Sequence, residues 1–171
     1  MTAEEIIALL GLAPHPREGG FFREIYRADE GVAAPALPAR YGGPRALGTA
    51  IYYLLTPHAF SPMHRLLSDE IFHFYLGDPV ELLLLEPGAA GRTMVLGTDL
   101  AAGMRPQGIV RRGVWQGARL VAGGACALLG TTVAPGFDYA DYADGERDAL
   151  IAAWPAHAEL IRALTPSPAT A

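Results

Sequence analysis

Apolar and polar residues alternate in short stretches along most of the chain, and nearly every stretch ends at glycine, proline or aspartate. Alternation with a period of two is typical of half-buried β-strands, because successive side chains point to opposite faces. The stretches of this kind are 48–55, 70–76, 79–86, 91–96, 107–111, 117–122 and 125–133, with an earlier one at 21–27. Many short strands separated by turns predict a β-sandwich or barrel over about residues 21–135.

The period changes at both ends of the chain. Thr2-Ala-Glu-Glu5 has the pattern of a capping box, which predicts a short helix over residues 2–10. From about residue 144 to 164 apolar residues recur at helical spacing, and Pro155 predicts a break between two short helices. Pro166 and Pro168 predict a frayed tail.

Two further features concern the course of the chain. Residues 28–47 are rich in alanine, proline and glycine, which predicts a long flexible loop that could act as a lid. The alternation in 21–27 predicts Arg23 and Arg27 on one face of a strand and Glu24 on the other. The chain shows no repeat or composition shift, so its 171 residues (1–171) are predicted to form a single domain.

Composition excludes several functional classes. The net charge of −5 disfavours nucleic acid as a partner, since phosphate binding needs a basic surface. The chain has no lysine, so all 13 basic residues are arginine and lysine Schiff-base chemistry is excluded. The apolar runs are too short to span a membrane, and the acidic start lacks a signal-peptide pattern, which predicts a cytoplasmic protein. Cys126 is the single cysteine; it is predicted to be buried and inert.

The candidate chemistry gathers between residues 58 and 77. A strand that begins at Glu70 would place Glu70, Phe72 and Phe74 on one face and His73 on the other. His64 lies shortly before this strand, and a buried carboxylate can orient an imidazole and raise its basicity. Such a pair suits proton abstraction next to a carbonyl. His58 follows Thr-Pro in a turn pattern and is interpreted as a surface residue.

This segment resembles the first motif of the cupin superfamily, which reads Gly, His-x-His, Glu, Gly. His64 matches the first histidine, Glu70 the glutamate and Gly77 the last glycine, whereas Leu66 stands in place of the second histidine. Gln116 stands where the second cupin motif has its histidine. A metal site needs three or four ligands, so no cofactor is expected and a metal at His64 and Glu70 is disfavoured.

A closer resemblance rests on five strings in the order of one small family. They are Pro-His-Pro-Arg-Glu-Gly-Gly-Phe-Phe-Arg-Glu at 14–24, Thr-Ala-Ile-Tyr-Tyr-Leu-Leu-Thr-Pro at 49–57, residues 68–79, Gly-Val-Trp-Gln at 113–116 and Val-Ala-Pro-Gly-Phe-Asp at 133–138. Together they resemble the DUF985 (cupin-5) family. The resemblance implies an all-β double-stranded β-helix, a jelly-roll barrel with short terminal helices, that forms a homodimer and has a pocket similar to that of sugar-nucleotide epimerases.

The similarity to those epimerases implies roles for particular residues. They use a histidine base, a carboxylate partner and a tyrosine acid, so His64 is the expected base and Glu70 its partner. Tyr53, Tyr75 and Tyr139 are candidates for the acid. The residues expected to contact a ligand are Gln116, Arg23, Phe72, Phe74, Tyr53 and Arg119. The arginines could clamp an anion, or serve only as ion pairs, and Glu70 could instead tie a loop through Arg65 or Arg23.

Three functions remain open at this point. The first is a metal-independent isomerase or epimerase acting on a sugar-like or nucleotide-linked carbonyl compound, with His64 as base. The second is a non-catalytic protein that binds or senses a small ligand. The third is a metal-dependent oxygenase or isomerase that uses His64, Glu70 and a third ligand not evident in the sequence. Fold alone does not choose among them.

Overall fold

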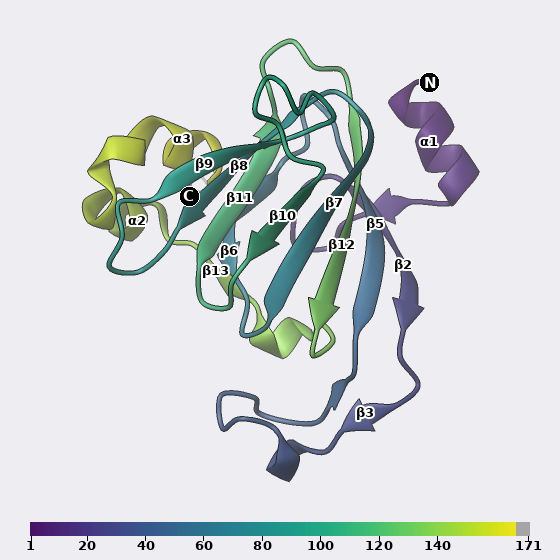
Figure 1. Ribbon diagram of the computed structural model, residues 1–171, viewed down its shortest axis with the longest axis vertical. Coiled ribbons are helices and arrows are strands. Elements are labelled where there is room, and N and C mark those ends of the chain that lie inside the picture. Colours follow the sequence, from purple (N-terminus) through teal and green to yellow (C-terminus); the bar gives the residue numbers. More distant parts are fainter. Residues whose placement is uncertain (167–171) are drawn as a thin grey trace, which may run out of the picture.

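The computed structural model describes residues 1–166, and two antiparallel sheets packed face to face form its barrel (Figure 1). The six-stranded sheet has the order β1 (Ala13–Pro14), β2 (Phe21–Arg27), β5 (Thr49–Leu55), β12 (Ala127–Ala134), β7 (Asp69–Gly77) and β10 (Gln107–Val110). The five-stranded sheet has the order β13 (Ala143–Asp144), β6 (Ser61–Arg65), β11 (Trp115–Leu120), β8 (Val80–Leu85) and β9 (Arg92–Leu96). The predicted all-β jelly-roll fold is confirmed.

The space between the sheets is filled by the inward side chains of each strand. Phe72 and Phe74 of β7 are 2% and 9% exposed, and they share one apolar cluster with Leu82 and Leu84 of β8. His73 points outward, as the alternation predicts, and bonds Thr132 Oγ1 at 2.9 Å. Burying apolar surface contributes about 25 cal/mol per Å², so this layer holds the two sheets together.

Helices cover outer surfaces of both sheets. They are α1 (Ala3–Leu10), α2 (Arg147–Ala153) and α3 (Ala158–Ala163), and short 3-10 turns occur at Ala34–Ala36, Tyr139–Asp141 and Pro155–His157. Leu83 and Leu85 of β8 face away from the barrel interior and pack against α2 and α3, which explains why β8 is apolar on both faces. None of the helices within residues 1–166 is long and apolar enough to span a membrane.

The terminal predictions are confirmed where the structure describes the chain. Thr2 and Glu5 form the capping box of α1, and Gly11 ends that helix with φ 61°. The break at Pro155 separates α2 from α3. Cys126 is buried, and burial raises the pKa of its thiol. The predicted tail at Pro168 lies outside the described residues.

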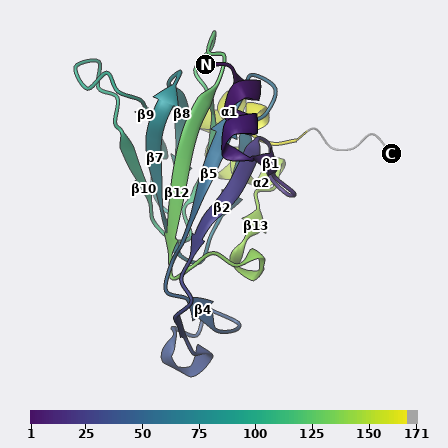
Figure 2. The same ribbon diagram turned by 90° about the vertical axis from the view of Figure 1, so that its right-hand side faces the viewer.

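The segment 28–47 is more ordered than the sequence predicts. It contains a short two-stranded sheet of β3 (Gly31–Val32) and β4 (Arg45–Ala46), and it extends from one end of the barrel (Figures 1 and 2). Arg45 anchors the end of this segment to the barrel. Its Nε and Nη2 donate to the two carboxylate oxygens of Asp141 at 2.7 and 2.5 Å. Both side chains are buried, at 5% and 3% exposure.

We expect Arg45→Ala to lower the free energy of unfolding by about 3–5 kcal/mol, because it leaves the Asp141 carboxylate buried without its cation. The measurement is the urea unfolding midpoint. Arg162→Ala is the control, since Arg162 is exposed on α3 and its loss should change stability by less than about 0.5 kcal/mol. Equal effects of the two substitutions would show that the Arg45 pair does not anchor the segment.

Candidate functional site

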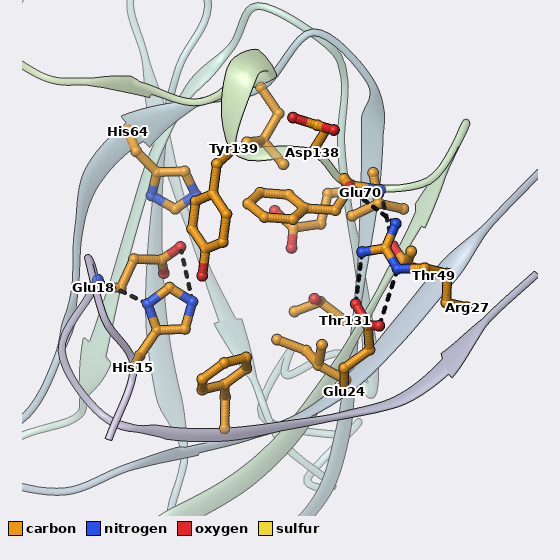
Figure 3. Close-up of a pocket in the computed structure, with 15 residues that line it drawn as sticks. His15, Glu18, Glu24, Arg27, Thr49, His64, Glu70, Thr131, Asp138 and Tyr139 are labelled. Carbon is orange, nitrogen blue, oxygen red and sulfur yellow. Dashed lines mark hydrogen bonds and ion pairs between the residues drawn. The ribbon is translucent and has the colours of Figure 1, made fainter. Parts of the chain in front are cut away.

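A cavity of about 400 Å³ opens at the end of the barrel nearest the β3–β4 extension (Figure 3). The register there brings together the start of β5, the end of β12 and the start of β7, as Val133 lies opposite both Thr49 and Glu70. The lining residues are His15, Glu18, Phe22, Glu24, Arg27, Thr49, Ile51, His64, Leu66, Glu70, Thr131, Val133, Phe137, Asp138 and Tyr139. Both residues predicted to be catalytic, His64 and Glu70, line it.

His64 projects from β6, a strand that the sequence did not predict. Its side chain is 2% exposed, and its Nδ1 lies 2.8 Å from the carbonyl oxygen of Pro62. A carbonyl oxygen only accepts hydrogen bonds, so Nδ1 must carry the proton and Nε2 of the neutral ring is a proton acceptor. The imidazole stacks on Tyr142 with ring centroids 4.8 Å apart. The backbone and one aromatic ring therefore fix the orientation of this imidazole.

Glu70 is 7% exposed at the start of β7, and its hydrogen-bond partner is Gln116. Gln116 Nε2 donates to Glu70 Oε2 at 2.6 Å, so the carboxylate contacts neither Arg65 nor Arg23, the alternative that the sequence left open. Burial raises the pKa of Glu70, and the charge of His64 and hydrogen bonds from Gln116 and Thr131 oppose that rise. No hydrogen bond or ion pair within residues 1–166 joins His64 to Glu70.

His15 lies in the loop between β1 and β2 and was not recognised in the sequence as a site residue. Its Nδ1 accepts hydrogen bonds from the backbone N–H groups of Glu18 at 2.8 Å and Arg17 at 3.3 Å. Nδ1 is therefore the unprotonated nitrogen, and Nε2 carries the hydrogen. Burial lowers the pKa of His15, as does the nearby His64, while Glu18 opposes that change. His15 is thus held as a neutral hydrogen-bond donor.

Glu18 is a second carboxylate that the sequence reading missed. Its side chain is 12% exposed, and its Oε2 accepts from Ser61 Oγ at 2.9 Å and lies 3.3 Å from the Tyr53 hydroxyl. Tyr53 also donates to the carbonyl of Gly19 at 2.8 Å. His15 and Glu18 both fall in the string 14–24 that carried the family resemblance, and polar residues in a shared loop motif were the available signal.

The prediction that Arg27 and Glu24 lie on opposite faces of β2 is wrong, because both line the cavity. The pairing of β2 with β5 skips Ile25, because Glu24 lies opposite Ile51 and Tyr26 opposite Ala50. This bulge changes the phase of the strand and places Arg27 in the cavity lining together with Glu24. Arg27 Nε and Nη2 donate to the two oxygens of Glu24 at 3.0 and 2.7 Å.

Several residues predicted to bind a ligand do not line the cavity. Arg23 donates to the carbonyl of Leu10 at 2.9 Å and so attaches β2 to the end of α1. Arg119 pairs with Glu81 on the neighbouring strand at 3.1 Å. Phe72 and Phe74 belong to the apolar core. Of the two arginines, only Arg119 forms the ion pair that was the alternative to anion binding.

Tyr53 and Gln116 lie next to the cavity without lining it, and His58 lies away from it. Tyr53 is buried in the core and reaches the cavity only through the contact of its hydroxyl with Glu18. Gln116 is 1% exposed, contacts Glu70, and its Oε1 has no partner within residues 1–166. His58 is exposed in the turn after β5, as predicted.

The donors around His64 do not fit the metal site of a typical cupin. Leu66 is a buried hydrocarbon at the place of a second histidine, and the Gln116 amide nitrogen faces Glu70. Within the described part of the chain, no group of three or more His, Cys, Asp and Glu side chains is arranged to hold a metal ion. His64 and Glu70 are two donors of suitable chemistry, whereas a protein metal site needs three or four.

Comparison with known proteins gives a consistent result. The Cupin_5 family model, described as the cupin superfamily (DUF985), matches residues 4–143. A protein of Shewanella oneidensis is 32% identical with a TM-score of 0.86, covering 98% of this chain and 99% of its own. A hypothetical protein from Leishmania major is 30% identical with a TM-score of 0.85, covering 98% and 100%.

More distant structures share the fold alone. A Bacillus subtilis oxalate decarboxylase variant is 13% identical with a TM-score of 0.53, and the match covers 92% of this chain and 38% of that chain. No protein with a curated description matches this sequence.

We expect Glu70→Gln to change how stability depends on pH. Burial holds the pKa of Glu70 above 4.5, its ordinary value, so the folded state favours the neutral acid more than the unfolded chain does. This preference adds to the free energy of unfolding in full below pH 4.5. The contribution is lost as the pH rises from 4.5 through the folded-state pKa, at about 1.4 kcal/mol per pH unit. Relative to Glu70→Gln, the wild type should therefore lose stability as pH rises above 4.5.

Urea unfolding between about pH 4 and pH 8 measures this difference. Glu159→Gln is the matched control, because Glu159 is exposed on α3. Parallel curves for the wild type and Glu70→Gln would show that the Glu70 carboxyl does not favour its neutral form in the folded protein.

Proposed function

The chain belongs to the Cupin_5 (DUF985) family of the cupin superfamily, and from this premise we propose that it is a metal-independent isomerase or epimerase of a small polar carbonyl compound. One observation carries the proposal. Backbone contacts hold the two histidines of the cavity as opposite tautomers, so Nε2 of His64 accepts a proton and Nε2 of His15 donates a hydrogen bond. Enolisation needs these two functions together.

The reaction begins when His64 Nε2 takes a proton from the carbon next to the substrate carbonyl. The electron pair of the broken C–H bond forms a C=C bond, and the carbonyl π pair moves to oxygen. His15 Nε2–H stabilises that oxygen, and a neutral imidazole can do this without ionising. Return of a proton to the same carbon from the other face restores the carbonyl and gives an epimer. In a substrate with a hydroxyl group on the α-carbon, the hydroxyl proton moves to the former carbonyl oxygen and a proton adds to the former carbonyl carbon. The α-carbon then becomes the new carbonyl, which gives an isomer.

Tyr139 is the best candidate for the acid among the three tyrosines considered. It lines the cavity, and Figure 3 shows its hydroxyl directed toward the side that holds His15 and Glu18. Burial, with the charge of Glu18, raises its pKa, so it keeps its proton at neutral pH. The Tyr53 hydroxyl is already bound by Gly19, and Tyr75 lies on the outer face beside Tyr52.

Glu70 acts on His64 through space in this scheme. The two groups line the same cavity without a hydrogen bond, and a charge on His64 lowers the pKa of Glu70 against the rise that burial causes. When His64 takes the substrate proton it becomes an imidazolium, and a carboxylate in the same low-dielectric space stabilises that cation. This replaces direct orientation of the ring, a task that Pro62 performs.

We expect His64→Gln to abolish exchange of the substrate's α-hydrogen. The protein is incubated in D₂O with a panel of 2-ketoses and nucleoside-diphosphate-linked 4-keto sugars, and mass spectrometry measures deuterium uptake. His58→Gln is the matched control, because His58 is exposed in a turn and lies outside the cavity lining. Exchange retained in His64→Gln would overturn the assignment of the base. Saturable binding without exchange in the wild type would indicate a binding protein instead.

We expect His15→Gln to slow exchange by a factor of about 10²–10³, the usual cost of losing one donor to a developing oxyanion. Its effect should fall on the turnover number, since the donor acts on charge that forms in the transition state. The measurement is the exchange rate at saturating and at limiting substrate. A change confined to the Michaelis constant would assign His15 to binding only.

A further inference from the structure

The cavity contains more negative than positive charge. Four carboxyl groups line it, those of Glu18, Glu24, Glu70 and Asp138, whereas Arg27 is the one lysine or arginine side chain of residues 1–166 that does so. The Arg27 guanidinium is already hydrogen-bonded within the protein. Both oxygens of Glu24 accept from it, and the carbonyl of Phe137 accepts from its Nη1 at 3.2 Å. A phosphate or carboxylate of a ligand would therefore meet no free guanidinium there.

Glu18 is one of three cavity carboxylates without an arginine partner in residues 1–166, since only Glu24 forms such an ion pair. Hydroxyl groups of Ser61 and Tyr53 contact Oε2 of Glu18, and no lysine or arginine of residues 1–166 lies within 4.0 Å of the carboxylate. The histidine beside it, His15, is held neutral by the two backbone N–H groups that bind its Nδ1. By contrast Glu24 binds Arg27. The hydrogen bonds to Glu24 and Asp141 raise the pKa of Arg27 and of Arg45, and the charge of Asp138 adds to each rise.

One oxygen of Glu18 is uncommitted. Oε2 accepts from Ser61 and contacts Tyr53, whereas Oε1 accepts no hydrogen bond within residues 1–166 and lies 4.0 Å from His15 Nε2, beyond hydrogen-bond distance. The negative charge reaches across the cavity, since Glu18 contributes to the raised pKa of Tyr139 and of Glu70. Burying such a charge is costly unless a cation approaches it.

Aromatic rings adjoin the same place. The imidazole of His15 lies 4.5 Å from Phe22 and 6.5 Å from Tyr139, and Tyr139 lies 5.0 Å from Phe137. Figure 3 shows Glu18, His15 and Tyr139 on the side of the cavity opposite Glu24 and Arg27. A carboxylate beside aromatic faces is the combination that binds ammonium groups, by charge-assisted hydrogen bonds and cation–π attraction.

We propose that Glu18 Oε1 binds a protonated amine of the ligand, so that the substrate class is an amine-bearing carbonyl compound such as an amino sugar. This rests on the proposed function for the carbonyl chemistry and adds the recognition group. It replaces the anion clamp expected from Arg23 and Arg119, which lie outside the cavity lining. The reacting carbonyl lies near His15 and His64, and the ammonium group lies against Glu18 and Tyr139.

The test compares three hexoses that differ in charge: D-glucosamine, D-glucose and D-glucuronate. Calorimetry and NMR titration at about pH 6, where the amine is protonated, measure the dissociation constants. Glucosamine should bind at least about tenfold more tightly than glucose, as one charge-assisted hydrogen bond provides, and glucuronate should bind least. Equal or absent binding of the three sugars, or tightest binding of glucuronate, would overturn the proposal.

Glu18→Gln is the decisive variant. Its amide oxygen can still accept from Ser61 while the charge is lost, so the preference for glucosamine should fall to near one. Glu159→Gln on α3 is the matched control and should keep it. A preference that survives in Glu18→Gln would assign the cation to another group. In the wild type, the ¹³C resonance of the Glu18 carboxyl should shift with glucosamine and not with glucose, which tests the contact without any substitution.

These outcomes are separable from those of the proposed reaction. Binding of glucosamine does not require a base, so His64→Gln should keep the charge preference. If His64→Gln kept both the preference for glucosamine and the rate of deuterium exchange, the amine site would stand and the assignment of His64 as the base would be overturned. If His64→Gln lost exchange but the wild type showed no preference for glucosamine, the assignment of the base would stand and the amine site would be overturned.

Discussion

The two sheets bury polar side chains at one end of the barrel, and the hydrogen bonds that satisfy those side chains determine what the cavity can do. A buried polar group without a partner costs about 1–3 kcal/mol, and His64 and Glu70 each have a particular neighbour that avoids this cost. The Pro62 carbonyl accepts a hydrogen bond from His64 Nδ1–H, and backbone N–H groups donate to Nδ1 of His15. These contacts leave Nε2 of each ring for a ligand, and they assign the two rings different roles.

Backbone groups make these assignments more firmly than a side chain would. An ionisable partner changes with pH, whereas a carbonyl always accepts and an amide N–H always donates. The expected pair of His64 and Glu70 would have made the tautomer of one group depend on the protonation of the other. In the structure each has its own partner, the Pro62 carbonyl or the Gln116 amide, and no hydrogen bond within residues 1–166 joins the two.

The sequence predicted the parts of the molecule that local patterns control. The capping box of α1, the alternation of β7 and the break at Pro155 each follow from neighbouring residues, and each was confirmed. Strand β6, Ser-Pro-Met-His-Arg, was missed because proline interrupts it and no residue in it favours a strand. Its pairing with β11 and β13 imposes the extended form.

The site was predicted less completely than the fold, because its contacts join distant segments. His64 and Glu70 were found by their spacing, whereas Glu18 meets Ser61 across 43 residues and Gln116 meets Glu70 across 46. The bulge at Ile25 gave no local signal, yet it moved Arg27 into the cavity lining. Alternation within one strand cannot reveal a register shift, since the shift depends on the partner strand.

A chain of contacts links His64 to the loop before β2 through Tyr142, Arg17 and Asp144. The ring of Tyr142 stacks on the imidazole on one side, and the guanidinium of Arg17 lies 4.7 Å from the centre of the same ring. Arg17 in turn pairs with Asp144 at 2.6 Å, and Asp144 lies opposite His64 in the pairing of β13 with β6. The loop that supplies His15 and Glu18 is therefore fastened to the strand that supplies His64. Tyr142 and β13 lie shortly before α2, so the C-terminal region that packs on the outside of the barrel begins beside His64.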